Sequence, residues 1–511
     1  MQRLSVILIV GLCVPPRATP EQHVTSTAQG RLRGEVHEGY VSYRGVPYAS
    51  LASPDGRFKT AGLAPLWAGI RQARPTQCTP TSSVEQCLQL DVHVPAGAGP
   101  WPVLAWLAAG AGPYQPQPLV REGIILIIVY HRIGPQGFFC LGEDKISGNA
   151  GIKDVVLALR WIRDNIVAFK GDAAKVVMAG QGFGAAVAEA VMLSPMAAGL
   201  YQGVVLQSGS ALAPWAFNYD AKERAKKLAE ILSDNKNISV TLLKSEIDDL
   251  VDKSNKLDMT YFPFGICIEN AMKHEEILLS EAPFDLLSSK KIHNVPMIIG
   301  YNNDEAYIFA SILQEPRVTK TMSRKMTFLL PEELKFLNNR EMMLLANQME
   351  DMYFKSSKSL RAVLDYHRDA YFLNHIHRSA LLHASSHPVY YYQFSYTGDR
   401  GVQEDLGVQK TGASHSDELA YLMSGLELSG EDATVQMHLV KFWTNFVKYL
   451  NPTFKEPTRW DALDPDFPRL LDIGTELNMI DFPHTRSMTM WDDIYEKYYY
   501  SRNRHAGYTK T

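Results

Sequence analysis

The sequence predicts an α/β protein whose central sheet is mostly parallel and is covered by helices on both faces. Short apolar runs recur along the chain, and the run at 123–130, GIILIIVY, is almost entirely aliphatic. Helix-like segments at 154–169 and 185–193 separate such runs. A parallel strand that is buried on both faces gives a continuous apolar run, so this pattern favours strands joined by crossover helices. The runs that we expect to form strands are 101–107, 123–130, 174–179, 203–207, 295–300 and 388–394.

The rest of the chain is mostly helical in pattern. Residues 220–290 and 305–385 read as insertions after sheet strands, because no linker, repeat or low-complexity tract sets them apart. The chain has 511 residues and a net charge of −4. Nucleic-acid binding relies on clustered Lys and Arg, so this charge balance argues against a nucleic-acid partner. We therefore expect one large domain over residues 21–511.

The N-terminus predicts a secretory signal peptide over residues 1–20. Arg3 precedes the apolar run Leu4–Val14, which ends at Pro15 and Pro16. This run is shorter than the about 20 residues that a membrane-spanning helix needs, and it fits the apolar region of a signal. The alternative is a buried N-terminal segment. No later stretch is long and apolar enough to cross a bilayer, so we expect a secreted, extracellular protein without a membrane anchor.

The cysteines and one sequon fit an extracellular setting. Cys78 and Cys87 lie nine positions apart among turn-forming residues, a spacing that suits a disulfide-closed loop. Cys140 and Cys267 either pair or remain buried thiols, and we favour thiols because free cysteines are often small buried hydrophobes. The sequence Asn237-Ile238-Ser239 is a glycosylation acceptor in a polar stretch. We therefore expect a glycan at Asn237.

The most informative motif is the glycine-rich turn at 180–184, GQGFG, between the run at 174–179 and the helix at 185–193. A nucleophile elbow has the pattern G-x-S-x-G, because its sharp turn packs so closely that the flanking positions must be small. Both outer glycines are present, but Gly182 takes the place of the serine. A phosphate-binding turn is the alternative, and it lacks the lysine or the fuller fingerprint that such turns carry.

Several further motifs carry a resemblance to a known family. These segments are YRGVPYA at 43–49, VEQCLQLDV at 84–92, YHRIGPQGF at 130–138, GNAGIKDVVLALRWIRDNIVAFKGD at 148–172 and QSG at 207–209. On these segments the chain resembles the type-B carboxylesterase and cholinesterase family over nearly all of the region after the signal, which implies the α/β-hydrolase fold. The resemblance also implies a Cys78–Cys87 disulfide and, by analogy, an ion pair between Arg44 and Glu85.

The family's catalytic triad can be carried over one position at a time. The acid belongs to a G-x-x-x-D-E motif, which places it at Glu305, and the histidine belongs to GASHSDEL at 412–419, which places it at His415. The chain order of nucleophile, acid and histidine agrees with the fold. The nucleophile position falls on Gly182, which has no side chain. The resemblance therefore implies a triad remnant rather than an intact triad.

The family's oxyanion loop is altered as well. The segment 106–112 reads WLAAGAG, so Ala108 replaces a histidine, and Ala109 and Ala111 replace glycines on either side of Gly110. A Cβ at such positions opposes the dihedrals that turn backbone N–H groups toward an oxyanion. Phe183 follows the nucleophile position, where the family has a small residue, and we expect it to intrude into the site.

Other groups could in principle replace the serine. Ser208 is the best candidate by position, but in the family the matching serine lies behind the site, so we do not expect it to act as nucleophile. His415 and Glu305 could activate water as a general base, which would be slow. A buried, hydrogen-bonded pair that only stabilises the fold explains both residues equally well, because losing one partner would leave the other unsatisfied.

Three functions remain in view. The first is a non-catalytic extracellular interaction or adhesion protein with a protein partner, similar to glutactin, neurotactin or neuroligin and insect-like in its motifs. The second is a non-hydrolysing binder of small apolar esters or lipids, and the third is a residual carboxylic ester hydrolase. The sequence implies no cofactor and no metal. A homodimer is an option, because the amphipathic stretch 435–450 matches a region through which relatives associate.

Overall fold

The structure is a computed structural model. It describes residues 23–51, 53, 56–74, 77–110, 112, 114–233, 237–257, 263–273, 275–314, 327, 330–356, 359–401 and 408–505. The predicted signal peptide at 1–20 lies outside these residues.

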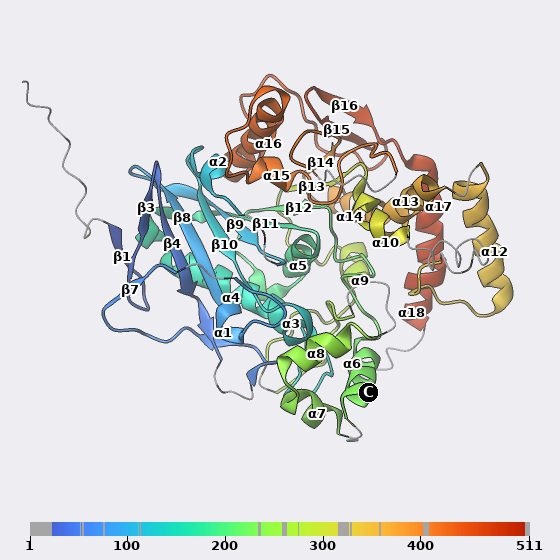
Figure 1. Cartoon of the computed structure of the whole chain (residues 1–511), viewed down its shortest axis with the longest axis horizontal. Coiled ribbons are helices and arrows are strands. Elements are labelled where there is room, and N and C mark those ends of the chain that lie inside the picture. The colour runs from blue at the N-terminus through green and yellow to red at the C-terminus, as the bar shows by residue number, and fades with distance from the viewer. Residues whose placement is uncertain are drawn as a thin grey trace, which may run out of the picture.

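An eleven-stranded sheet runs through the molecule (Figure 1). Its central strands pair in parallel, and antiparallel pairs occur toward both edges. This arrangement confirms the predicted mostly parallel α/β fold. In sheet order, the strands are β16 (Leu477–Asp481), β15 (Arg469–Ile473), β14 (Val389–Phe394), β13 (Met297–Asn302), β12 (Gly203–Gln207), β11 (Gly171–Gln181), β9 (Trp101–Leu107), β10 (Ile125–Val129), β8 (Gln89–Pro95), β4 (Tyr40–Pro47) and β3 (Glu35–His37).

Strand β9 shows why its sequence is continuously apolar. Val103 and Leu107 belong to the hydrophobic cluster on one face of the sheet, whereas Leu104 and Trp106 belong to the cluster on the other face. Because successive strand residues point to opposite faces, a strand covered on both sides needs apolar residues at every position. Two small sheets lie outside the main one, formed by β1 (Val24–Ser26), β2 (Arg31–Arg33) and β7 (Ile70–Gln72), and by β5 (Ala49–Ser50) and β6 (Gly62–Leu63).

Helices cover both faces of the sheet (Figure 1). The predicted helix at 154–169 is α4 (Ala150–Asn165) followed by the 3-10 turn η3 (Ile166–Phe169). Helices α3 (Gly134–Phe138) and α5 (Phe183–Met192) pack with α4, and α16 (Gly430–Tyr449) covers the opposite face. The stretch at 435–450 is therefore a helix docked on the sheet, and the homodimer stays a prediction.

The two predicted insertions are mostly helical, as expected. Among the described residues, no helix is both long enough and apolar enough to span a bilayer. The remaining helical elements are α1 (Val84–Cys87), α2 (Gln117–Val120), η4 (Pro195–Ala197), α6 (Ala221–Leu232), α7 (Ile238–Lys244), α8 (Ile247–Ser254), α9 (Pro283–Ser288), η5 (Glu305–Phe309), α10 (Ala310–Leu313), α12 (Asn339–Met349), η7 (Glu350–Phe354), α13 (Leu360–Arg368), η8 (Asp369–Leu373), α14 (Asn374–Ala384), α15 (Leu419–Leu422), α17 (Thr485–Tyr495), η9 (Glu496–Tyr500) and α18 (Ser501–His505).

Two disulfides join cysteines of the described residues. The predicted Cys78–Cys87 bridge is confirmed. Our preference for free thiols at Cys140 and Cys267 is wrong, because these residues are disulfide-bonded across 127 positions. Gly148 lies between them with a φ of +111°, and a Cβ there would approach both sulfurs to 2.8 Å. No local spacing in the sequence signals a contact between residues that far apart.

The Arg44–Glu85 ion pair expected by analogy is also wrong. Arg44 pairs instead with Glu35, nine residues earlier in the chain. Antiparallel pairing places Glu35 on β3 opposite Ser42 on β4, and this brings its carboxylate within reach of the Arg44 guanidinium. Glu85 is exposed in the first turn of α1.

Candidate functional site

The turn between β11 and α5 has the geometry of a nucleophile elbow. Gly182 has φ +57° and ψ −121°, which an L-residue adopts only under strain. The flanking glycines are required by close packing: a Cβ on Gly180 would lie 2.4 Å from the Gly184 backbone, and a Cβ on Gly184 would lie 2.7 Å from the Leu107 carbonyl oxygen. The strand-to-helix turn expected from the sequence is therefore present.

The direction of the missing side chain is informative. A Cβ built on Gly182 would lie 3.1 Å from His415 Nε2, so this position faces the imidazole. The neighbouring side chain of Gln181 takes up that contact, with its Nε2 3.0 Å from His415 Nε2. A carboxamide carries both a donor and an acceptor, so it can satisfy a neutral or a protonated ring. The sequence did not suggest this role for Gln181.

Glu305 and His415 are brought together as the carried-over motifs imply. His415 Nδ1 lies 2.6 Å from Glu305 Oε2, and Glu305 Oε1 accepts a hydrogen bond from the backbone N–H of Asn302 at 2.9 Å. Glu305 is fully buried, whereas 17% of the His415 side chain is exposed. Burial opposes protonation of the imidazole, but the Glu305 carboxylate outweighs it and raises the pKa of His415 above its ordinary value.

A second buried carboxylate lies behind this pair. Glu418 accepts hydrogen bonds from Gln207 Nε2 at 2.9 Å and from the side-chain amide of Asn302. Burial, followed by repulsion from Glu305, raises the pKa of Glu418 to about 7. Glu418 belongs to the GASHSDEL motif, but its spacing alone gave no reason to assign it a role.

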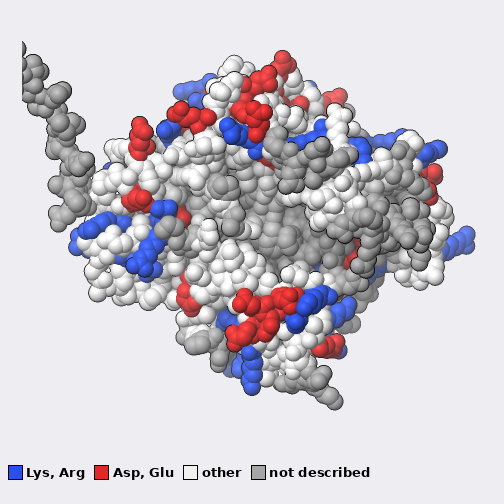
Figure 2. Space-filling view, in the orientation of Figure 1, with Lys and Arg blue, Asp and Glu red and all other residues white. Residues whose placement is uncertain are grey.

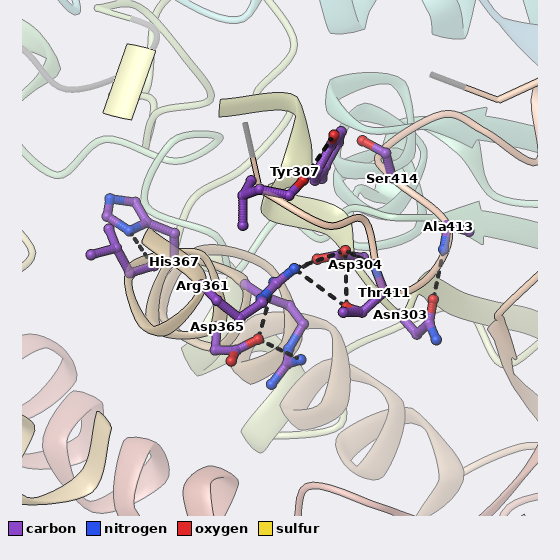
Figure 3. A network of polar contacts seen from close by, with 12 residues as sticks. Asn303, Asp304, Tyr307, Arg361, Asp365, His367, Thr411, Ala413 and Ser414 are labelled. Carbon is purple, nitrogen blue, oxygen red and sulfur yellow. Dashed lines mark hydrogen bonds and ion pairs between the residues drawn. The ribbon is translucent and has the colours of Figure 1, made fainter. Parts of the chain in front are cut away.

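A polar network anchors the two loops that carry the pair (Figure 3). Arg361 on α13 reaches Asp304 with both terminal nitrogens, at 2.9 and 2.6 Å. Asp304 also accepts bonds from the N–H and hydroxyl of Thr411, at 3.0 and 3.1 Å. Asn303 Oδ1 accepts the N–H of Ala413 at 2.8 Å. Because residues 303–304 precede Glu305 and residues 411–413 precede His415, the network fixes both loops against each other.

The altered oxyanion loop lies beside α5. Ala108 continues the strand, because its N–H donates to the Val129 carbonyl at 3.0 Å. A Cβ on Gly184 would lie 3.5 Å from the Ala109 Cβ, so Ala109 packs close to the first turn of α5. Gly110 has a φ of +152°. Ala111 lies outside the described residues.

Ala109 and Phe183 form part of the wall of an apolar cavity of about 320 Å³. The Phe183 ring packs edge-to-face on Phe138, with ring centroids 4.9 Å apart. Phe183 therefore borders this space and does not fill it. The other lining residues come mainly from the α3 region, α8 and the segment after it: Pro80, Ile133, Gly134, Pro135, Val251, Ser254, Asn255, Pro263 and Phe264.

The other candidate residues take no part in the His415 contact. Ser208 is buried with a φ of +54°, and within the described part of the chain its hydroxyl has no hydrogen-bond partner. Asn237 is exposed and caps α7 by accepting the Val240 N–H at 3.0 Å, and its glycosylation stays a prediction. The described residues contain no group of three His, Cys, Asp or Glu side chains placed to hold a metal ion.

Comparison with known sequences identifies the family. Residues 21–491 match the sequence profile described as the Carboxylesterase family. This chain belongs to the carboxylesterase family. The elbow, the cavity beside it and the Glu305–His415 pair are thus features of a carboxylesterase-family member in which a glycine occupies the elbow centre.

Named relatives and a solved structure support this assignment. The chain is similar to human Carboxylesterase 5A, with 27% identity over 82% of this chain and 79% of the relative. It is also similar to juvenile hormone esterase of Tribolium castaneum, with 26% identity over 90% and 89% of the two chains. The crystal structure of juvenile hormone esterase from Manduca sexta, with OTFP covalently attached, superposes with a TM-score of 0.83 at 25% identity, covering 93% of this chain and 99% of that one.

Proposed function

We propose that this carboxylesterase-family chain is a secreted, non-catalytic protein that holds a small apolar ester or acyl ligand without hydrolysing it. The observation that carries the proposal is Gly182, which occupies the strained centre of the elbow and faces His415 with no hydroxyl. An acyl transfer through this site would need a nucleophile at that point, held within hydrogen-bond reach of the imidazole.

The absence of a nucleophile has a large effect on the activation free energy. Removing the nucleophile of a Ser-His-Asp triad lowers the rate on the order of 10⁶-fold, which corresponds to about 8 kcal/mol of transition-state stabilisation. The residual catalysis of such variants depends on the oxyanion hole, and here Ala108 and Ala109 alter the loop that would supply it. His415 Nε2 contacts Gln181 in place of a nucleophile. These features support binding without turnover.

The cavity beside the elbow supports a small apolar ligand. Its volume of about 320 Å³ and its lining of Phe, Pro, Ile and Val side chains suit an acyl or short ester group. The secreted location rests on the predicted signal peptide. A role in binding an extracellular protein partner stays a prediction, and the experiment below gives it a separate outcome.

The test measures binding and turnover together. Purified protein is titrated with decanoic acid and with its methyl ester, and both the thermal midpoint and the amount of intact ester are measured. A ligand at 100 times its Kd stabilises a protein by about 2.7 kcal/mol, so binding gives a clear upward shift. Val251→Trp should fill the cavity and abolish the shift, whereas Val167→Trp, at an exposed site outside the cavity lining, should leave it unchanged.

Each outcome has a distinct meaning. A shift that is lost in Val251→Trp, with the ester recovered intact, supports the proposal. Hydrolysis by the natural protein well above the rate in buffer would contradict the non-catalytic assignment. The absence of a shift with both probes would reject ligand binding in this cavity and favour a protein-interaction role for the fold.

A further inference from the structure

A second and more polar groove is lined in part by residues of β4 and β7. Figure 1 shows these two strands at one end of the fold, away from α5 and the elbow that precedes it. The volume of the groove is about 550 Å³, larger than that of the apolar cavity. Apart from Gly45 and Ile70, the described residues that line it are arginines and glutamines: Arg71, Arg74, Gln72, Gln77, Gln86 and Gln89. None of these described lining residues carries a carboxylate, so the guanidinium groups dominate their electrostatic character.

The arginines extend beyond the groove itself. Arg31 and Arg33 lie on β2, which pairs in parallel with β7, the strand that contains Arg71. After β7 the chain continues beside β4, where the backbone N–H of Arg74 donates a hydrogen bond to the carbonyl of Arg44. Figure 2 shows Lys and Arg side chains gathered over this end of the molecule, where Figure 1 places β1 and β7.

These guanidinium groups are available to a ligand. Arg44 is paired with Glu35, but within the described part of the chain Arg31, Arg33, Arg71 and Arg74 have no ion pair. The Nε of Arg33 is buried and has no hydrogen-bond partner among the described residues. Arg71 and Arg74 both line the groove without an ion pair to the described residues, so an anion bound between them would offset their mutual repulsion.

The glutamine side chains of the groove indicate which uncharged groups a ligand would carry. The side chains of Gln72 and Gln77 make no hydrogen bond to the described residues, and each offers donors and an acceptor. Gln77 also lines a neighbouring cavity of about 290 Å³, which contains the rings of Tyr40, Tyr114 and Tyr130. Hydroxyl groups pair with amides and phenols, whereas sulfate and carboxylate oxygens pair with the arginine fork.

We propose that this groove binds a sulfated polysaccharide, with the sulfates on Arg71 and Arg74 and the sugar hydroxyls on Gln72 and Gln77. This site is independent of the elbow and of the proposed function. The whole chain carries a net charge of −4, so attraction of the chain as a whole to polyanions would not account for binding at this groove.

The experiment measures the affinity of the full chain for a heparin hexasaccharide by titration calorimetry. Each substitution removes a donor of charge-assisted hydrogen bonds, so Arg71→Ala/Arg74→Ala should weaken binding by at least about tenfold. The matched control, Arg163→Ala/Arg459→Ala, makes the same change in net charge at two exposed sites outside the groove and should leave the affinity within about twofold. Thermal melting of each variant checks that the fold is intact.

Two further probes separate the ligand chemistries. Gln77→Leu should weaken the binding of the hexasaccharide but leave the binding of inorganic sulfate unchanged. In the proposed complex only the sugar, and not a sulfate group, contacts Gln77. Hyaluronan, which carries carboxylates and no sulfate, should bind more weakly than heparin. The proposal is overturned if the control pair weakens binding as much as the groove pair, if duplex DNA of the same charge binds as tightly as heparin, or if heparin does not bind.

Discussion

Placing a serine at the elbow centre tests the central interpretation of the site. In Gly182→Ser the new Cβ would lie 3.1 Å from His415 Nε2, so the imidazole must yield by a few tenths of an ångström. The serine Oγ could then take over the hydrogen bond that Gln181 Nε2 now makes to the same nitrogen at 3.0 Å. Because Glu305 already orients the ring through Nδ1 at 2.6 Å, the variant would assemble three residues in the triad order.

The expected gain in activity is limited by two features of the structure. A complete triad contributes on the order of 10⁶ in rate, but each missing oxyanion donor costs about 10²–10³, and the loop at 108–110 is altered. We therefore expect Gly182→Ser to hydrolyse a short-chain nitrophenyl ester about 10³-fold faster than the natural protein. The left-handed φ of +57° should cost the variant about 1–3 kcal/mol of stability.

The assay pairs ester hydrolysis with covalent labelling by a serine-directed fluorophosphonate, located by mass spectrometry. Gly182→Ala is the matched control, because it adds the same Cβ at the same φ but no hydroxyl. Labelling at position 182 together with hydrolysis only in the serine variant would support the reasoning. A folded serine variant that is neither labelled nor active would show that His415 and Glu305 are not placed to activate a nucleophile.

Three further changes follow from the buried interactions. Arg361→Ala should destabilise the chain by about 2 kcal/mol in denaturant unfolding, since it leaves the buried Asp304 carboxylate short of its cation; the 22% exposure of Arg361 keeps the loss below that of a fully buried pair. Glu418→Gln should flatten the pH dependence of stability. Folding raises the pKa of Glu418 from 4.5 to about 7, so the native state loses stability as the pH rises from 4.5 to about 7. A glutamine at this position does not titrate, so the variant lacks that loss. Cys140→Ala/Cys267→Ala should lower stability by at most about 4–5 kcal/mol, the chain-entropy value for a 127-residue separation.

Each of these predictions has a contradicting result. Arg361→Ala would argue against the network if its unfolding matched that of Arg459→Ala, which alters an arginine that is 82% exposed. An unchanged slope of stability between about pH 4.5 and 7, the window set by these pKa values, would show that Glu418 does not titrate as expected. Equal thermal midpoints with and without reductant would show that the Cys140–Cys267 bridge adds no stability.

Much of the fold could be predicted because the central strands are buried on both faces. The continuous apolar runs at 101–107 and 203–207 coincide with β9 and β12. Strands at or next to the edges of the sheet escaped prediction for the opposite reason. β4 contains Ser42, Arg44 and Gly45, and β16 is only partly covered, so neither gives a continuous apolar run. Their places in the sheet depend on tertiary pairing that local sequence does not encode.

The residues of the candidate site were likewise predicted only in part. Motif order was enough to bring Glu305, His415 and Gly182 to one place, because these positions lie in segments with recognisable patterns. The partners Gln181, Glu418 and Arg361 were missed, since each acts through a contact made only in the folded chain. Arg361 in particular comes from a helical insertion with no distinctive motif, 57 residues from the Asp304 that it binds.

The wide spacing of the elbow and its partners also bears on how the chain folds. The Glu305–His415 contact joins positions 110 residues apart, and the Gln181–His415 contact joins positions 234 apart. Contacts of such long range form only after a large loop-closure cost has been met, and parallel sheets are slow to assemble for the same reason. This cluster should therefore be among the last parts of the molecule to become ordered. The fluorescence or exchange protection of groups around His415 would then report the completion of folding, whether or not the site ever meets a substrate.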